Sequence, residues 1–222
     1  MSFVVEVFEA QSYAREAAAR IALDLPGEGA VVLTGGTTAR DVLREVAGSD
    51  AGWGSLDVFF SDERCVPPDD ARSNYGMAAR LLLDHVEPRR VHRMRGEDEP
   101  HAAARAYSEE ITSAERPPFD LVVLGMGADC HIAAMFPGSD ALKAPDMCVA
   151  VDRPDGLRGL TLTPPALLPS HKVLLIVAGQ NKAEAVRRAV AGDEPPDRCP
   201  ARLLAEHGDA TFLLDEPSAS LL

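Results

Sequence analysis

Residues 119–139, FDLVVLGMGADCHIAAMFPGS, combine the pattern of a buried strand and turn with side chains that can take part in acid–base chemistry. They begin with a continuous apolar run at 121–124, which is typical of a strand buried on both faces of a parallel sheet. Gly125-Met126-Gly127 then allows a sharp turn at the carboxyl end of this strand. Asp129 and His131 come directly after the turn. Because open α/β sheets bind ligands beyond the carboxyl ends of their strands, these two side chains are predicted to belong to a functional site.

The rest of the chain alternates strand-like and helix-like patterns. Strands are predicted at 3–8, 30–33, 56–61, 147–151, 160–163, 172–177 and 210–214. Helices are predicted at 12–25, 38–46, 73–83, 102–112, 181–191 and 201–206. This alternation predicts a single α/β domain over residues 1–222, with a doubly wound, mainly parallel, Rossmann-like sheet flanked by helices.

The composition is that of an ordinary globular protein, with 46% apolar and 26% charged residues. No apolar run approaches the roughly 18 residues that suggest a membrane span. The N-terminal MSFVVEVFEA has no basic leader, and Glu6 interrupts its apolar run, so a signal peptide is not expected. We therefore expect a cytoplasmic protein.

Charge and cysteine content exclude several partners. The net charge of -13 and the pI near 4.8 argue against nucleic acid or an anionic membrane surface. His85, His92 and His101 lack metal-ligand spacing and are predicted to be exposed to solvent. No C-x-x-C pair occurs, so free thiols are expected at Cys65, Cys130, Cys148 and Cys199. We expect no metal, no cofactor, and a monomer or weak homodimer.

A glycine-rich turn follows the strand predicted at 30–33. Thr38 and Asp41 fit a capping box, which would start the next helix at Thr38. Gly35, Gly36 and Thr37 would then lie just before the helix, with backbone amides free to bind a phosphate. A plain tight turn explains these residues equally well.

Two further strand ends carry charged residues. Arg64 follows the strand at 56–61 and precedes a loop rich in proline and aspartate, where ordered loops are often functional. Its alternative role is a surface ion pair with Asp62 or Glu63. After the strand at 172–177, Asn181 is predicted to cap a helix whose first residue is Lys182. A cation fits that helix end best when an anion is bound there.

The strand ends together suit acid–base chemistry on a small phosphorylated substrate. His131 is the natural base near neutral pH, although a hydrogen-bonded core histidine is the simpler alternative. Cys130 as a nucleophile activated by His131 is a weaker alternative, because adjacent side chains do not face each other on a strand or helix. A nucleotide-binding module is weaker still, since Cys130 stands where the third glycine of the dinucleotide fingerprint is due.

Residues 125–131 followed by Phe136-Pro137-Gly138 resemble the signature of the 6-phosphogluconolactonase family. Residues 34–38, 61–67 with Ser73-Asn74, and 179–183 resemble the other segments of this family, in the same order. The resemblance implies the fold of the sugar-phosphate isomerases and deaminases. It also implies hydrolysis of 6-phosphogluconolactone to 6-phosphogluconate, a step of the pentose phosphate pathway, without a metal.

The resemblance also implies roles for individual residues. His131 would activate the attacking water, with Asp129 orienting the site and Arg64 assisting catalysis. Arg158 is a further candidate for anion binding. The residues implied to bind the phosphate or stabilise the oxyanion are Gly35, Gly36, Thr37, Arg64, Asn74 and Lys182.

The chain departs from the family pattern at Cys130, where Gly is usual, and at Ile132 and Ala134, where Thr and Ser are common. If position 130 needs a positive φ, Cys130 would be strained by about 1–2 kcal/mol. The first alternative is a glucosamine-6-phosphate deaminase-like enzyme, which typically has Asp-Glu-Tyr instead of Asp-Glu-Arg and an acid in place of Phe136. The second is a non-catalytic sugar-phosphate-binding protein, which would not need His131.

Overall fold

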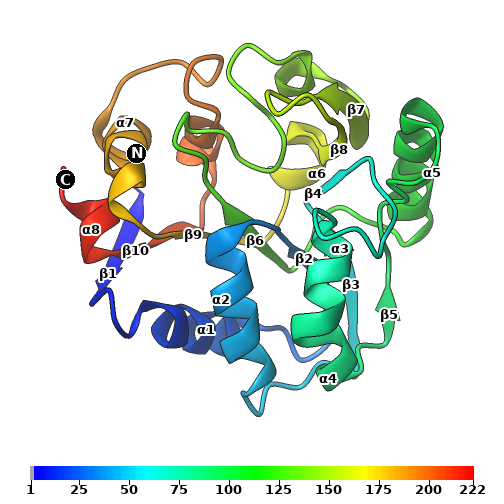
Figure 1. Ribbon diagram of the computed structural model, residues 1–222, viewed down its shortest axis with the longest axis horizontal. Coiled ribbons are helices and arrows are strands. Elements are labelled where there is room, and N and C mark those ends of the chain that lie inside the picture. Colours follow the sequence, from blue (N-terminus) through cyan, green and yellow to red (C-terminus); the bar gives the residue numbers. More distant parts are fainter. Residues whose placement is uncertain (1–2) are drawn as a thin grey trace.

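The computed structural model describes residues 3–222, which are arranged around a seven-stranded sheet (Figure 1). Its strand order is β1-β10-β9-β6-β2-β3-β5, and every neighbouring pair is parallel. The predicted doubly wound, mainly parallel fold is therefore confirmed. The strands are β1 (Val4–Phe8), β2 (Gly29–Leu33), β3 (Leu56–Phe60), β5 (Arg90–Val91), β6 (Leu121–Gly125), β9 (Lys172–Val177) and β10 (Ala210–Asp215).

Helices cover both faces of this sheet (Figure 1). The α-helices are α1 (Tyr13–Asp24), α2 (Thr37–Ala47), α3 (Asn74–Ala78), α4 (Asp84–Val86), α5 (Pro100–Ser113), α6 (Pro164–Leu167), α7 (Ala183–Ala191) and α8 (Glu216–Ala219). A π-helical segment, η1 (Ala79–Leu83), joins α3 to α4, and the 3₁₀ helices are η2 (Asp140–Lys143), η3 (Gln180–Lys182) and η4 (Pro200–Glu206). No helix of residues 3–222 is both long and apolar enough to cross a membrane.

The core consists of two apolar layers separated by the sheet. Alternate side chains of each strand enter opposite layers: Val31 packs with α1 and α2, and Val32 packs with α5. Val122 and Val123 of β6 divide in the same way. Because both faces are buried, the strands are continuous apolar runs, which is why they are easy to recognise in the sequence.

A second sheet was not anticipated. It is antiparallel, with the order β4 (Asp62–Arg64), β8 (Arg158–Leu162) and β7 (Cys148–Asp152), and it lies on the α5 side of the main sheet (Figure 1). The residues of β4 were predicted to follow the end of the strand at 56–61 and not to form a strand of their own. Short apolar strands look alike in sequence whichever sheet they join, so the patterns at 147–151 and 160–163 could not reveal this separation.

The position of the site follows from the order of the strands. β3 pairs with one side of β2, whereas β6 pairs with the other side. The winding therefore reverses between β2 and β6, and the loops beyond these strands separate to leave a crevice. Residues 34–37 and the segment that carries His131 border this crevice.

One local prediction fails in the core. His92 was predicted to be exposed, but it is 9% exposed and stacks on Phe59, with the ring centroids 4.2 Å apart. Its Nδ1 lies 2.6 Å from Glu110 Oε1. The residues that flank His92 in the sequence are rich in charge and suggest exposure. The residues that bury it come from β3 and α5, which are distant in the sequence.

Candidate active site

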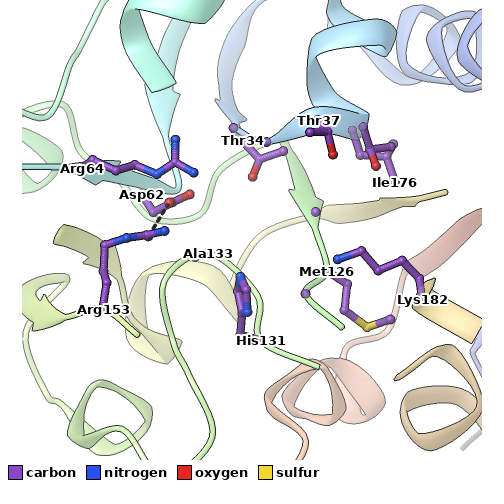
Figure 2. Close-up of a pocket in the computed structure, with 15 residues that line it drawn as sticks. Thr34, Thr37, Asp62, Arg64, Met126, His131, Ala133, Arg153, Ile176 and Lys182 are labelled. Carbon is purple, nitrogen blue, oxygen red and sulfur yellow. Dashed lines mark ion pairs between the residues drawn. The ribbon is translucent and has the colours of Figure 1, made fainter. Parts of the chain in front are cut away.

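A cleft of about 600 Å³, including its open mouth, lies beyond the carboxyl ends of β2, β6 and β9 (Figure 2). Among the predicted residues, those lining it are Gly35, Gly36, Thr37, Arg64, His131 and Lys182. Asp62 and Arg153, which were not predicted as site residues, also line it.

Asp129 holds the imidazole of His131 at Nδ1. Its Oδ1 lies 2.6 Å from Nδ1 and also accepts a hydrogen bond from the His131 backbone N–H, at 3.2 Å. Burial acts to raise the pKa of Asp129, but the hydrogen bonds and charge of His131 outweigh it and lower the pKa to about 2. An ionised carboxylate can only accept, so Nδ1 carries the proton and the Nε2 of neutral His131 is free to act as a base.

The turn before His131 depends on a close backbone approach. The N–H of Gly127 donates to the carbonyl of His131 at 2.9 Å, and the N–H of Cys130 donates to the carbonyl of Gly127 at 3.1 Å. A Cβ at position 127 would overlap the imidazole of His131, so only glycine fits there.

Cys130 has a φ of 72°, the left-handed conformation that was expected to strain a residue with a side chain. Its side chain is completely buried, and its thiol faces the carbonyl of Ala185 at 3.6 Å. The thiol therefore points into the interior and not into the cleft. This excludes the alternative in which Cys130 is the nucleophile.

The amino end of α2 presents free backbone amides to the cleft. Gly36 is the N-cap residue, with a φ of 100°, and no side chain caps the helix. The helix begins at Thr37, so the predicted capping box of Thr38 and Asp41 is wrong. Since no side chain accepts from the first N–H groups, they and the helix dipole remain available to an anion.

Lys182 extends into the cleft from the side opposite Arg64 (Figure 2). It ends η3 and is itself the N-cap residue of α7, so the predicted capping by Asn181 is wrong. Burial lowers the pKa of Lys182, while the charge of Asp129 opposes this change. A cation that is partly desolvated in this way gains more from pairing with a bound anion than an exposed one does.

Arg64 is held by polar groups other than carboxylates. Its Nη1 donates to the carbonyl of Arg72 and to Asn74 Oδ1, both at 2.7 Å. Within residues 3–222, no ion pair joins Arg64 to Asp62 or Glu63, so the surface ion-pair alternative is wrong. The charge of Arg64 therefore remains available to a ligand.

Glu63 and Asn74 lie behind this arginine. The buried carboxylate of Glu63 accepts from Ser73 Oγ at 2.9 Å and from the N–H groups of Asn74 and Tyr75 at 2.7 and 2.8 Å. Burial raises the pKa of Glu63, and these hydrogen bonds oppose the rise. Asn74 also donates to the carbonyl of Asp62, at 2.9 Å, and does not line the cleft. Asn74 was predicted to contact the ligand, but in the structure it holds Arg64 in position instead.

Arg153 is a site residue that the sequence did not reveal. It follows β7 in the turn to β8, and its Nη1 lies 3.9 Å from Asp62 Oδ2 (Figure 2). Arg158, the predicted candidate, instead contacts His101 Nε2 at 3.1 Å and lies outside this cleft. The Pro-Asp-Gly sequence after Arg153 is a hairpin signal, but only the folded second sheet shows which arginine faces the cleft.

Cations flank the base on two sides. Figure 2 shows Arg64 and Arg153 on one side, Lys182 and Thr37 on the other, and His131 between them. This local positive charge is set within a chain of net charge -13. Residues 3–222 contain no group of three or more His, Cys, Asp or Glu side chains placed to hold a metal ion. The arrangement suits a ligand with anionic or electron-rich groups at both ends and a reacting centre near His131.

Sequence comparisons point to one family. The sequence model described as glucosamine-6-phosphate isomerases/6-phosphogluconolactonase matches residues 6–213. A 6-phosphogluconolactonase of Streptomyces coelicolor is 35% identical over 218 residues, covering 88% of this chain and 83% of the relative. One of Treponema pallidum is 39% identical over 175 residues, covering 73% of this chain and 72% of the relative.

Solved structures show the same fold. The 6-phosphogluconolactonase of Trypanosoma cruzi superposes with a TM-score of 0.86 at 26% identity, covering 100% of this chain and 98% of its own. A monomeric glucosamine-6-phosphate deaminase gives a TM-score of 0.87 at 22% identity, with 99% of this chain and 100% of its own covered. The second likeness concerns the fold alone.

Proposed function

Because the chain belongs to the family of glucosamine-6-phosphate isomerases and 6-phosphogluconolactonases, we propose that it hydrolyses 6-phospho-D-glucono-1,5-lactone to 6-phosphogluconate. This is the lactone-opening step of the pentose phosphate pathway and makes the protein a carboxylic ester hydrolase. The observation that carries the proposal is the Asp129–His131 contact of 2.6 Å at the edge of a cleft flanked by cations. The names of the curated relatives support the same activity.

In the proposed mechanism, His131 is the general base. Nε2 takes a proton from water as the oxygen attacks C1 of the lactone, and the ionised Asp129 stabilises the imidazolium that forms. The carbonyl oxygen becomes an oxyanion in the tetrahedral intermediate. When this intermediate collapses, the bond from C1 to the ring oxygen breaks, and the proton on Nε2 passes to the leaving oxygen. One water is consumed, and no cofactor takes part in any step.

Each cationic side of the cleft is proposed to bind a different part of the substrate. The phosphate is assigned to the amino end of α2, at Gly35, Gly36 and Thr37, and to Lys182, because free amides and a partly buried ammonium group both favour a dianion. Arg64 and Arg153 are assigned to the lactone carbonyl and to the oxyanion. Asp62 contacts Arg153 and can accept hydrogen bonds from sugar hydroxyls.

All these groups come from one chain, so the proposed chemistry needs no residue from a second copy, and a monomer or a weak homodimer is proposed as the active form. A phosphorylated metabolite as substrate supports the cytoplasm as the place of action. Neither inference affects the chemistry at His131.

The test is to offer the purified protein two substrates in parallel. We expect hydrolysis of 6-phosphogluconolactone well above the spontaneous rate. The reaction is measured by a coupled assay that oxidises the 6-phosphogluconate formed. We expect no ammonia from glucosamine 6-phosphate. Release of ammonia without lactone hydrolysis would replace this proposal with a deaminase, and binding of 6-phosphogluconate without either reaction would indicate a sugar-phosphate-binding protein.

A further inference from the structure

Phe136 contacts both the base and an arginine of the cleft. Its ring centroid is 4.6 Å from that of His131, with the two planes inclined at 51°. The Cζ of Arg153 lies 5.5 Å from the same centroid. Phe136 is 9% exposed, so its contacts with these two groups form part of the protein interior.

Each of these two functional groups is also held by a carboxylate. Asp129 holds His131 at Nδ1 alone, and this contact does not prevent the ring from tilting about it. Arg153 lies 3.9 Å from Asp62, which is too long for a hydrogen bond, and its Nε and Nη2 donate to Asp155 Oδ2 at 3.2 and 3.1 Å. Packing against an aromatic ring adds a further constraint to each group.

The backbone around Phe136 is itself well anchored. The carbonyl of Phe136 accepts from the N–H of Ser139 at 3.0 Å, and the N–H of Gly138 donates to the carbonyl of Asp197 at 2.8 Å. Two residues earlier, the N–H of Ala134 donates to Thr161 Oγ1 of β8 at 3.0 Å. These hydrogen bonds fix the backbone that carries the Phe136 ring, so the ring can restrict the movement of His131 and Arg153.

We propose that Phe136 is a positioning residue that orients the general base His131 and Arg153 relative to one another. An uncharged ring supports the guanidinium by a cation–π contact and adds no negative charge to the carboxylates of Asp62 and Asp155 that already lie near it. A carboxylate at this position would pair with Arg153 and with His131 and would remove both functions. The role of Phe136 rests on the proposed lactone hydrolysis.

The test compares Phe136→Leu and Phe136→Tyr with the wild type in steady-state lactone hydrolysis. The leucine variant keeps an apolar side chain but loses the ring, and we expect kcat to fall about tenfold or more, because small displacements of catalytic groups carry large penalties in rate. KM should rise severalfold as Arg153 loses its support. The tyrosine variant keeps the ring and should retain activity within about threefold of the wild type.

Phe119→Leu is the matched control. Phe119 is fully buried and, like Phe136, packs against an aromatic ring, that of Phe59 at 5.2 Å, but it lies before the amino end of β6, away from the cleft. The Phe119→Leu variant should lose thermal stability with little change in kcat or KM. If Phe136→Leu does not fold, Phe136→Met fills the same space flexibly and takes its place.

The outcomes separate the role of Phe136 from the activity itself. Wild-type kinetics in a folded Phe136→Leu variant, or equal losses in the leucine and tyrosine variants, would overturn the positioning role and leave the lactonase function intact. A wild-type protein without lactone hydrolysis would overturn the proposed function and the positioning role with it. A loss in Phe136→Leu that Phe136→Tyr restores supports the role.

Discussion

At the residue scale, the contact between Asp129 and His131 decides which imidazole nitrogen can accept a proton. The pKa of Asp129 is lowered to about 2, so this carboxylate is ionised at every pH at which the protein would be assayed. Nδ1 must therefore donate to it, and Nε2 is left as the base. The acid limb of the pH profile should consequently not report Asp129.

We predict that Asp129→Asn lowers kcat about 10²- to 10⁴-fold, because the amide can donate to Nδ1 and so favour the tautomer with its proton on Nε2. Affinity for 6-phosphogluconate should change far less, since Asp129 does not line the cleft. The matched control is Asp140→Asn, an exposed carboxylate on the same segment, which should keep wild-type kinetics. Steady-state kinetics of the two variants check this, and an active Asp129→Asn enzyme would contradict it.

Cys130 is also a residue-scale question, since its φ of 72° disfavours any side chain and a β-branched one most. We predict that Cys130→Val lowers the free energy of unfolding by about 2 kcal/mol. Cys148→Val is the control, because Cys148 is equally buried but lies in β7, where valine is favoured. Urea unfolding measures both. Equal effects at the two sites would show that the backbone conformation at Cys130 is not strained.

At the element scale, the amino end of α2 and Lys182 form the proposed phosphate site. We predict that Lys182→Ala weakens competitive inhibition by inorganic phosphate at least tenfold, whereas Arg64→Ala mainly weakens inhibition by 6-phosphogluconate. Because burial lowers the pKa of Lys182, its contribution should disappear at a lower pH than that of an exposed lysine as the pH rises.

Lys143→Ala serves as the control for this prediction, since the Lys143 side chain is 79% exposed and pairs with Asp197 at 3.4 Å. It should bind phosphate as the wild type does. Unchanged inhibition by phosphate in Lys182→Ala would mean that the phosphate lies elsewhere in the cleft. Loss of phosphate binding in Arg64→Ala alone would move it to the arginine side.

The same elements show how far sequence reasoning reaches. The buried runs at 121–124 and 172–177 identify central parallel strands, and the parallel arrangement then brings Gly35, Arg64, His131 and Lys182 together. Arg153 could not be predicted, because it lies in an antiparallel hairpin. The sequence does not show how this hairpin packs against the rest of the protein. The helix starts at Thr37 and Ala183 were also missed, since glycine and lysine N-caps leave no capping signal.

At the scale of the whole molecule, the cleft is a small positive region in a strongly acidic protein. The net charge of -13 repels anions at long range, so an anionic substrate must be bound by short-range contacts with Arg64, Arg153, Lys182 and the amides of α2. Both layers of the core contribute to this arrangement, because α2 lies on one face of the sheet and the second sheet on the other. The fold thus assembles one site from segments spread over most of the chain.

The most direct test of the proposed chemistry is the rate of 6-phosphogluconolactone hydrolysis above its spontaneous background, in the wild type and in His131→Ala. We expect the variant to lose about 10²- to 10⁴-fold in kcat. It should still bind 6-phosphogluconate, because the phosphate site and both arginines remain in place. Equal rates of hydrolysis in the two proteins would show that His131 is not the base.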